Sequence, residues 1–164
     1  MKEKLAFEIV NAKEKDRQWL IKYVSENWGS SKIVSRGKVH QVEELPALIA
    51  KTLDGEYVGL LCYRIDSDEC EVVVLESLKE NCGVGTALME RVQSIAKEAR
   101  CKRVWLITTN DNLHALKFYQ KRGYSLVAVY RNAVEEARRF KPQIPLIGND
   151  GIPVRDEIEL EMIL

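Results

Sequence analysis

Segment 71–109 restricts the fold most, because a strand pattern, a glycine pair, a helix pattern and a second strand pattern follow one another there. EVVVL is apolar on both of its alternating faces, which predicts a strand in the centre of a sheet. After the glycines of CGVG, apolar residues from Leu88 to Ala99 recur at helical spacing and predict a surface helix over 84–100. RVWLITT then predicts a return to the sheet. This succession is typical of a mixed α/β fold.

Strand and helix patterns continue before this segment. Residues 5–10 predict a first strand, and a helix with Asp16 as its cap follows. ALIAKTL and EYVGLLCYRI are joined through Asp54-Gly55, a dipeptide typical of a tight hairpin turn. Residues 31–45 are ambiguous, and a short strand together with a loop fits them.

The C-terminal part adds a second long helix and two more strands. NDNLHALKFYQKRGY predicts the helix, with Asn110, Asp111 or Asn112 as cap and Gly123 at its end. SLVAVY and EIELEMIL predict the last strands, separated by a short helix, NAVEEARRF, and a Pro/Gly-rich loop. The chain has 164 residues, of which 46% are hydrophobic, so we expect one globular domain over residues 1–164.

The composition argues against several classes of protein. Lys+Arg and Asp+Glu are both 25, and no basic block occurs, which argues against nucleic-acid binding. No apolar run approaches the roughly 18 residues of a membrane span, and the charged N-terminus does not resemble a signal peptide. The 4 cysteines lack CxxC spacing and there are 2 histidines, so we expect no metal site. Reduced cysteines in a cytoplasmic protein are the expectation.

The glycine pair has the chemistry of an anion site. The first amides of a helix lack partners and attract anions, and glycine allows close approach of the backbone. A dinucleotide-binding fingerprint would need a third glycine where Leu88 stands, and a P-loop would need a lysine after Gly85, where Thr86 follows. Both nucleotide-binding motifs are therefore excluded, while a site for another anion stays open.

A second motif makes the pattern specific. Asn112, Ala115, Phe118-Tyr119 and Gly123-Tyr124 follow the spacing N-x-x-A-x-x-F-Y-x-x-x-G-Y. Together with the glycine loop, this motif resembles the GNAT superfamily of N-acetyltransferases, and KPQIPLIGNDGIPVRDEIEL is similar to the tail of uncharacterised prokaryotic members. The resemblance implies a GNAT-like fold, with a mostly antiparallel sheet of about seven strands, flanking helices and a splayed fourth and fifth strand.

The resemblance also implies acetyl-CoA as cosubstrate, bound in the opening between the splayed strands. Backbone groups of Val73 and Leu75 would pair with pantetheine, and the Val73 amide would polarise the thioester carbonyl. Amides of the glycine loop would hold the diphosphate. The residues assigned to the cofactor on this basis are Val73, Val74, Leu75, Cys82, Gly83, Val84, Gly85, Thr86, Asn112 and Tyr119.

Catalysis would follow the family's direct attack of an amine on the thioester. The hydroxyl of Tyr119 would act as acid or hydrogen-bond donor at the sulfur. Glu69 or Glu71 would act as base, since both share a strand face with Val73 if the alternation is regular. A member that binds acyl-CoA as a sensor with little turnover is the alternative function. A homodimer through the last strands also stays open.

One position departs from the family pattern. Glu80 stands where the family has Arg or Gln, so a carboxylate lies near the predicted diphosphate site. We expect Glu80 to point away, with some loss of cofactor affinity.

The acceptor, a small-molecule or peptide amine, would bind between residues 28–45 and 131–155. Four basic side chains there would form a solvated helix face or receive an acidic acceptor, namely Arg131, Arg138, Arg139 and Lys141. Trp28 is expected in the core, and His40 in a solvated or capping position.

Overall fold

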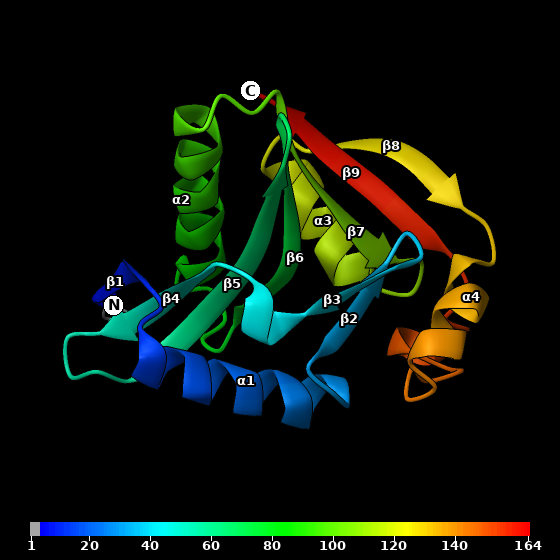
Figure 1. The fold of residues 1–164 in the computed structure, drawn as a ribbon, viewed down its shortest axis with the longest axis horizontal. Coiled ribbons are helices and arrows are strands. Elements are labelled where there is room, and N and C mark those ends of the chain that lie inside the picture. The colour runs from blue at the N-terminus through cyan, green and yellow to red at the C-terminus, as the bar shows by residue number, and fades with distance from the viewer. Residues whose placement is uncertain (1–3) are drawn as a thin grey trace.

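A mostly antiparallel sheet of seven strands forms the centre of the structure (Figure 1), a computed structural model that describes residues 4–164. The first three residues of the predicted domain 1–164 lie outside the described part. The strand order is β1-β4-β5-β6-β7-β9-β8, and only the β6–β7 pair is parallel. The strands are β1 (Phe7–Asn11), β4 (Ala47–Thr52), β5 (Tyr57–Asp66), β6 (Glu69–Ser77), β7 (Arg103–Thr109), β8 (Ser125–Tyr130) and β9 (Glu157–Ile163).

Helices and a small hairpin cover both faces of the sheet. The helices are α1 (Glu14–Trp28), α2 (Val84–Glu98), α3 (Leu113–Lys121) and α4 (Ala133–Phe140), and the hairpin consists of β2 (Lys32–Ser35) and β3 (Lys38–Gln41). α2 and α3 pack on one face through a core that contains Leu88 and Val92. α1 and the residues around the hairpin pack on the other face through Leu20, Val24 and Ile33. Short 3₁₀ turns lie at Val42–Glu44 and Asn149–Gly151.

β6 and β7 are paired at one end and separate toward the other, as the family resemblance predicted. Their pairing runs from Glu69 with Arg103 to Val72 with Leu106 and stops there, although both strands continue. At the same point the register between β5 and β6 shifts and skips Val73, which forms a β-bulge. β6 is the fourth strand in the sheet order and β7 the fifth, so the predicted splay is confirmed.

The cap expected for α1 is wrong, and the ambiguous segment 31–45 contains two short strands. Lys13, and not Asp16, is the N-cap residue of α1; Asp16 lies in the first turn and accepts a bond from the Lys13 amide at 2.9 Å. The carboxylate of Asp16 is buried, where it pairs with the Lys51 ammonium at 2.6 Å. Residues 31–45, which the sequence left between strand and loop, form the β2–β3 hairpin and a 3₁₀ turn.

Candidate active site

The turn between β6 and α2 presents backbone amides with no internal acceptor. Asn81 and Gly83 have positive φ angles of 56° and 79°, and α2 begins directly after Gly83. The first amide of this region with a backbone acceptor is that of Ala87, which donates to the Gly83 carbonyl at 3.0 Å. Within residues 4–164, the amides of Cys82, Gly83, Val84, Gly85 and Thr86 donate to no backbone carbonyl. We call these five residues the amide cradle.

Close packing against α3 holds the cradle in place. A Cβ atom at Gly85 would lie 3.1 Å from Cζ of Phe118, so a larger residue would fit here only if the ring moved by a few tenths of an ångström. The Arg122 guanidinium lies over the Phe118 ring, 3.7 Å from its centroid, and donates through Nε to Thr86 Oγ1 at 2.8 Å. A cation therefore lies beside the cradle. Arg122 was not predicted as a site residue, although it stands within the second motif.

A cavity of about 710 Å³ extends from the cradle into the opening between β6 and β7. Its charged lining is mostly basic, which suits a phosphorylated ligand. The basic residues of the lining are Lys79, Lys117, Lys121 and Arg122, and the acidic ones are Glu76 and Glu80. Glu80 lines this cavity and its side chain is exposed. The neighbouring Lys79 forms an ion pair with Glu56 at 3.3 Å. We call this space the cofactor cavity.

Tyr119 and Asn112 both reach the cofactor cavity. Tyr119 is 8% exposed, and burial raises the pKa of its phenol, so the hydroxyl stays protonated at neutral pH. Asn112 caps α3, because its Oδ1 accepts a bond from the Ala115 amide at 3.1 Å. The capping function of Asn112 is thus observed, and its side-chain amide nitrogen donates to no atom of residues 4–164.

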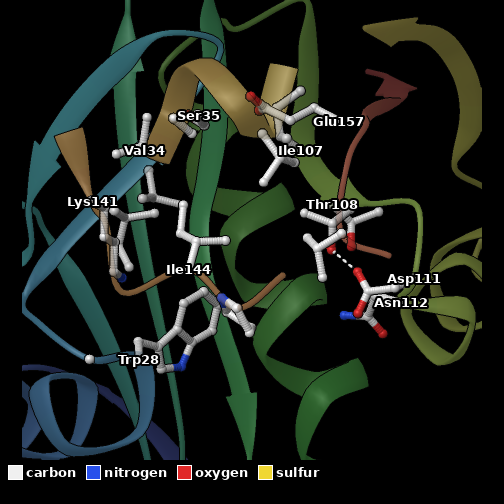
Figure 2. A pocket seen from close by; sticks show the side chains of 18 of the residues that line it. Trp28, Val34, Ser35, Ile107, Thr108, Asp111, Asn112, Lys141, Ile144 and Glu157 are labelled. Carbon is white, nitrogen blue, oxygen red and sulfur yellow. Dashed lines mark hydrogen bonds between the residues drawn. The ribbon is translucent and has the colours of Figure 1, made fainter. Parts of the chain in front are cut away.

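A second cavity of about 540 Å³ lies beside the first (Figure 2) and is lined by residues from the two segments predicted for the acceptor. The two cavities share wall residues where β6 and β7 separate: Trp28, Val72, Val73, Ile107, Thr108 and Asn112. The expectation that Trp28 lies in the core is wrong, because the residue is 36% exposed and donates to Glu76 Oε1 at 2.9 Å. We call this second space the acceptor cavity.

Glu71 lines the acceptor cavity and is held by a network from the β2–β3 hairpin. Ser35 Oγ donates to Glu71 Oε1 at 2.6 Å, and Arg64 approaches Oε2 at 3.4 Å. Burial raises the pKa of Glu71, although the bonds from Ser35 and Arg64 counteract this effect. Burial, with Arg64 and Lys38, lowers the pKa of His40 to about 4, so His40 is neutral near pH 7.

His40 belongs to the same network, and not to the solvated or capping position that the sequence suggested. Its ring is buried, and Nε2 lies 3.1 Å from Ser35 Oγ. Because the Ser35 hydroxyl donates its hydrogen bond to Glu71, the neutral His40 ring can donate a hydrogen bond to the serine oxygen. Nothing in the spacing of Ser35, His40 and Glu71 indicates this contact, which depends on the hairpin folding over the sheet.

The structure does not bring Glu69 to the same place. Its carboxylate accepts from Arg103 Nε at 3.0 Å, at the closed end of the β6–β7 pair, and the residue lines neither cavity. The regular alternation expected along β6 is also wrong, because the bulge at Val73 interrupts it. Val72 packs in the core on the α2 side, Val74 in the core on the α1 side and Leu75 again on the α2 side.

Residues 4–164 contain no group of three or more His, Cys, Asp or Glu side chains that could hold a metal ion. In the same part of the chain, no helix combines the length and the apolar character needed to cross a membrane.

Comparison with known proteins places these features in a family. Residues 13–124 match the model of the acetyltransferase (GNAT) family. The uncharacterized protein YdhI of Bacillus subtilis (strain 168) is 42% identical over 156 residues, which are 95% of this chain and 98% of YdhI. The uncharacterized protein YxbD of the same organism is 44% identical over 138 residues, which cover 84% of this chain and 87% of YxbD.

Solved structures share the fold at lower identity. An IAA acetyltransferase from Bacillus cereus superposes with a TM-score of 0.70 at 19% identity, over 97% of this chain and 100% of that one. A Bacillus subtilis acetyltransferase in complex with CoA gives 0.69 at 19% identity, over 98% and 99% of the two chains. A GNAT family acetyltransferase from Elizabethkingia anophelis with acetyl-CoA bound gives 0.67 at 22% identity, over 96% and 98%.

Proposed function

Because the chain belongs to the GNAT acetyltransferase family, we propose that it transfers the acetyl group of acetyl-CoA to a primary amine. The observation that carries this proposal is the amide cradle, whose five amides have no backbone acceptor within residues 4–164 and which opens onto the cofactor cavity. Unpaired amides at a helix N-terminus bind phosphate oxygens well. In addition, solved structures of the same fold contain CoA and acetyl-CoA.

The amine would attack the thioester where the two cavities meet. Val73 has no pairing partner on β5 or β7, so its amide is our candidate for binding the carbonyl oxygen as negative charge develops there. Glu71, two residues earlier on the acceptor side, would take the proton from the attacking nitrogen. The carbon–sulfur bond then breaks, and the Tyr119 hydroxyl would donate to the departing thiolate.

Thiol release tests the proposal directly. With acetyl-CoA and a panel of primary amines, we expect free CoA to appear in proportion to acetylated amine, and acetyl-CoA alone to raise the melting temperature. Binding of acetyl-CoA without thiol release from any amine would favour the sensor alternative. No thermal shift with any acyl-CoA would exclude both functions.

Replacing Tyr119 with Phe tests the hydroxyl separately from the ring. The ring packs edge-on against Phe118 and Tyr124, at centroid distances of 5.2 and 5.7 Å, and Phe preserves these contacts. A hydrogen bond to a charged group contributes about 1.5–3 kcal/mol. We therefore expect the turnover number to fall roughly 10- to 100-fold while the Kd for acetyl-CoA stays near its wild-type value. An unchanged turnover number would remove Tyr119 from the mechanism.

A further inference from the structure

We propose that the acceptor carries an acidic group as well as an amine: Lys141 binds the acidic group, and Glu157 receives the amine. This inference rests on the proposed acetyl transfer and adds the chemical class of the acceptor, an amino acid or a related aminocarboxylate. Two charged side chains of the acceptor cavity, both buried and both incompletely paired within the described residues, carry it.

Lys141 follows α4 and lines the acceptor cavity, where it is 6% exposed. Its Nζ donates to the Lys32 carbonyl at 2.9 Å, and it forms no ion pair with any carboxylate of residues 4–164. An ammonium group has three donors, so two remain for a ligand. Burial lowers the pKa of Lys141, because no counter-charge offsets the loss of water. An acidic group in the cavity would supply that counter-charge.

Glu157 begins β9 and is 3% exposed on the same cavity. Its Oε2 accepts a bond from the Arg36 amide at 3.1 Å, whereas Oε1 is buried without a partner. Among residues 4–164, Oε1 is the one buried side-chain nitrogen or oxygen without a hydrogen bond. Leaving a buried carboxylate oxygen unpaired is costly, and an ammonium donor from the acceptor would satisfy it.

The two groups occupy separate parts of the cavity wall, and Ile107 and Ile144 also line the cavity (Figure 2). This arrangement fits a molecule with opposite charges at its two ends. A diamine or polyamine would bring a second positive charge toward Lys141 and would be repelled.

The other basic residues near α4 are engaged elsewhere. Arg138 donates to the carbonyls of Ile144, Pro145 and Val154 and so fixes the loop. Arg139 is exposed and pairs with Glu136 at 3.4 Å. Among the four basic residues considered from the sequence, Lys141 is the one that lines the acceptor cavity. Arg139 provides a matched control, because it is exposed and lies outside the cavity wall.

The test compares amino acids whose two charges lie at opposite ends of the molecule with the amines that remain after decarboxylation, such as 4-aminobutanoate with propylamine and 6-aminohexanoate with pentylamine. Thiol release is measured for the wild type, Lys141→Gln and Arg139→Gln. Glutamine keeps a donor for the Lys32 carbonyl but removes the charge. We expect the wild type to favour the amino acid of each pair by roughly 10- to 100-fold in kcat/KM, mainly through KM. Lys141→Gln should lose this preference, and Arg139→Gln should keep it.

A binding measurement makes the inference independent of turnover. In the presence of CoA, the N-acetylated amino acids should raise the melting temperature of the wild type but not of Lys141→Gln. If the wild type acetylates plain amines equally well, or Lys141→Gln keeps the preference, the inference is overturned while acetyl transfer stands. If no compound releases thiol, the proposed function fails, and the thermal shift alone decides: a shift lost in Lys141→Gln supports the inference, and no shift overturns it.

Discussion

Glu71→Gln is expected to lower the turnover number about 10²–10⁴-fold, the usual contribution of a positioned base. Glutamine retains an oxygen for the Ser35 hydroxyl, which lies 2.6 Å from Glu71 Oε1, but it cannot take a proton. The Kd for acetyl-CoA, measured by calorimetry, should therefore stay close to the wild-type value. Glu69→Gln is the matched control on the same strand, because Glu69 pairs with Arg103 and lines neither cavity.

The pH dependence of the turnover number provides a second test of Glu71→Gln. Burial raises the pKa of Glu71 above its ordinary value of 4.5, so the carboxylate ionises later than in an exposed glutamate. A base acts only when ionised, so the turnover number should rise with pH through a limb centred above 4.5. His40, with a pKa of about 4, does not account for a limb in that range. A limb that persists in Glu71→Gln would assign it to another group, and an unchanged turnover number would exclude Glu71 as the base.

Gly85→Val is expected to weaken acetyl-CoA binding by roughly 100-fold, equivalent to losing about one hydrogen bond to a charged group. Its Cβ would meet the Phe118 ring at 3.1 and 3.3 Å, and the two γ-methyl groups would need still more room. The ring and the first turn of α2 must then move apart, which distorts the cradle and displaces Arg122 from Thr86.

A neighbouring substitution separates this effect from a general loss of helix stability. Ala87→Val also places a β-branched residue in the first turn of α2, but Ala87 does not line the cofactor cavity. Both variants should melt cooperatively without ligand, and only Gly85→Val should lose the thermal shift with acetyl-CoA. Tight binding by Gly85→Val would contradict the assignment of the cradle.

The sequence predicted most of the framework because its signals are local. The glycine loop, the hairpin turn at Asp54-Gly55 and the Asn112 cap each depend on residues close together in the chain, and the structure contains all three. The splay of β6 and β7 was also expected, but through the family resemblance and not through local pattern. Because of the bulge at Val73, Val74 and Leu75 face the sides of the sheet opposite to those that a regular alternation predicts.

The acceptor side could not be predicted in the same way. Ser35, Glu71 and Glu157 come from three separate segments, and their meeting depends on how the β2–β3 hairpin lies over the sheet. Lys141 is one of several basic residues in its segment, and only the path of the chain after α4 turns its side chain into the cavity wall. In sequence, Glu157 is one of three alternating glutamates of the last strand, which read as an ordinary polar face.

Amide NMR would show whether the cradle amides bind the diphosphate of the acetyl carrier. ¹⁵N-labelled protein would be titrated with CoA and, in parallel, with pantetheine, which lacks the diphosphate. We predict that CoA shifts the amide resonances of Gly83, Val84, Gly85 and Thr86 and that pantetheine leaves them in place. CoA binding that leaves these four resonances unmoved, or equal shifts with pantetheine, would show that the cradle does not bind the diphosphate.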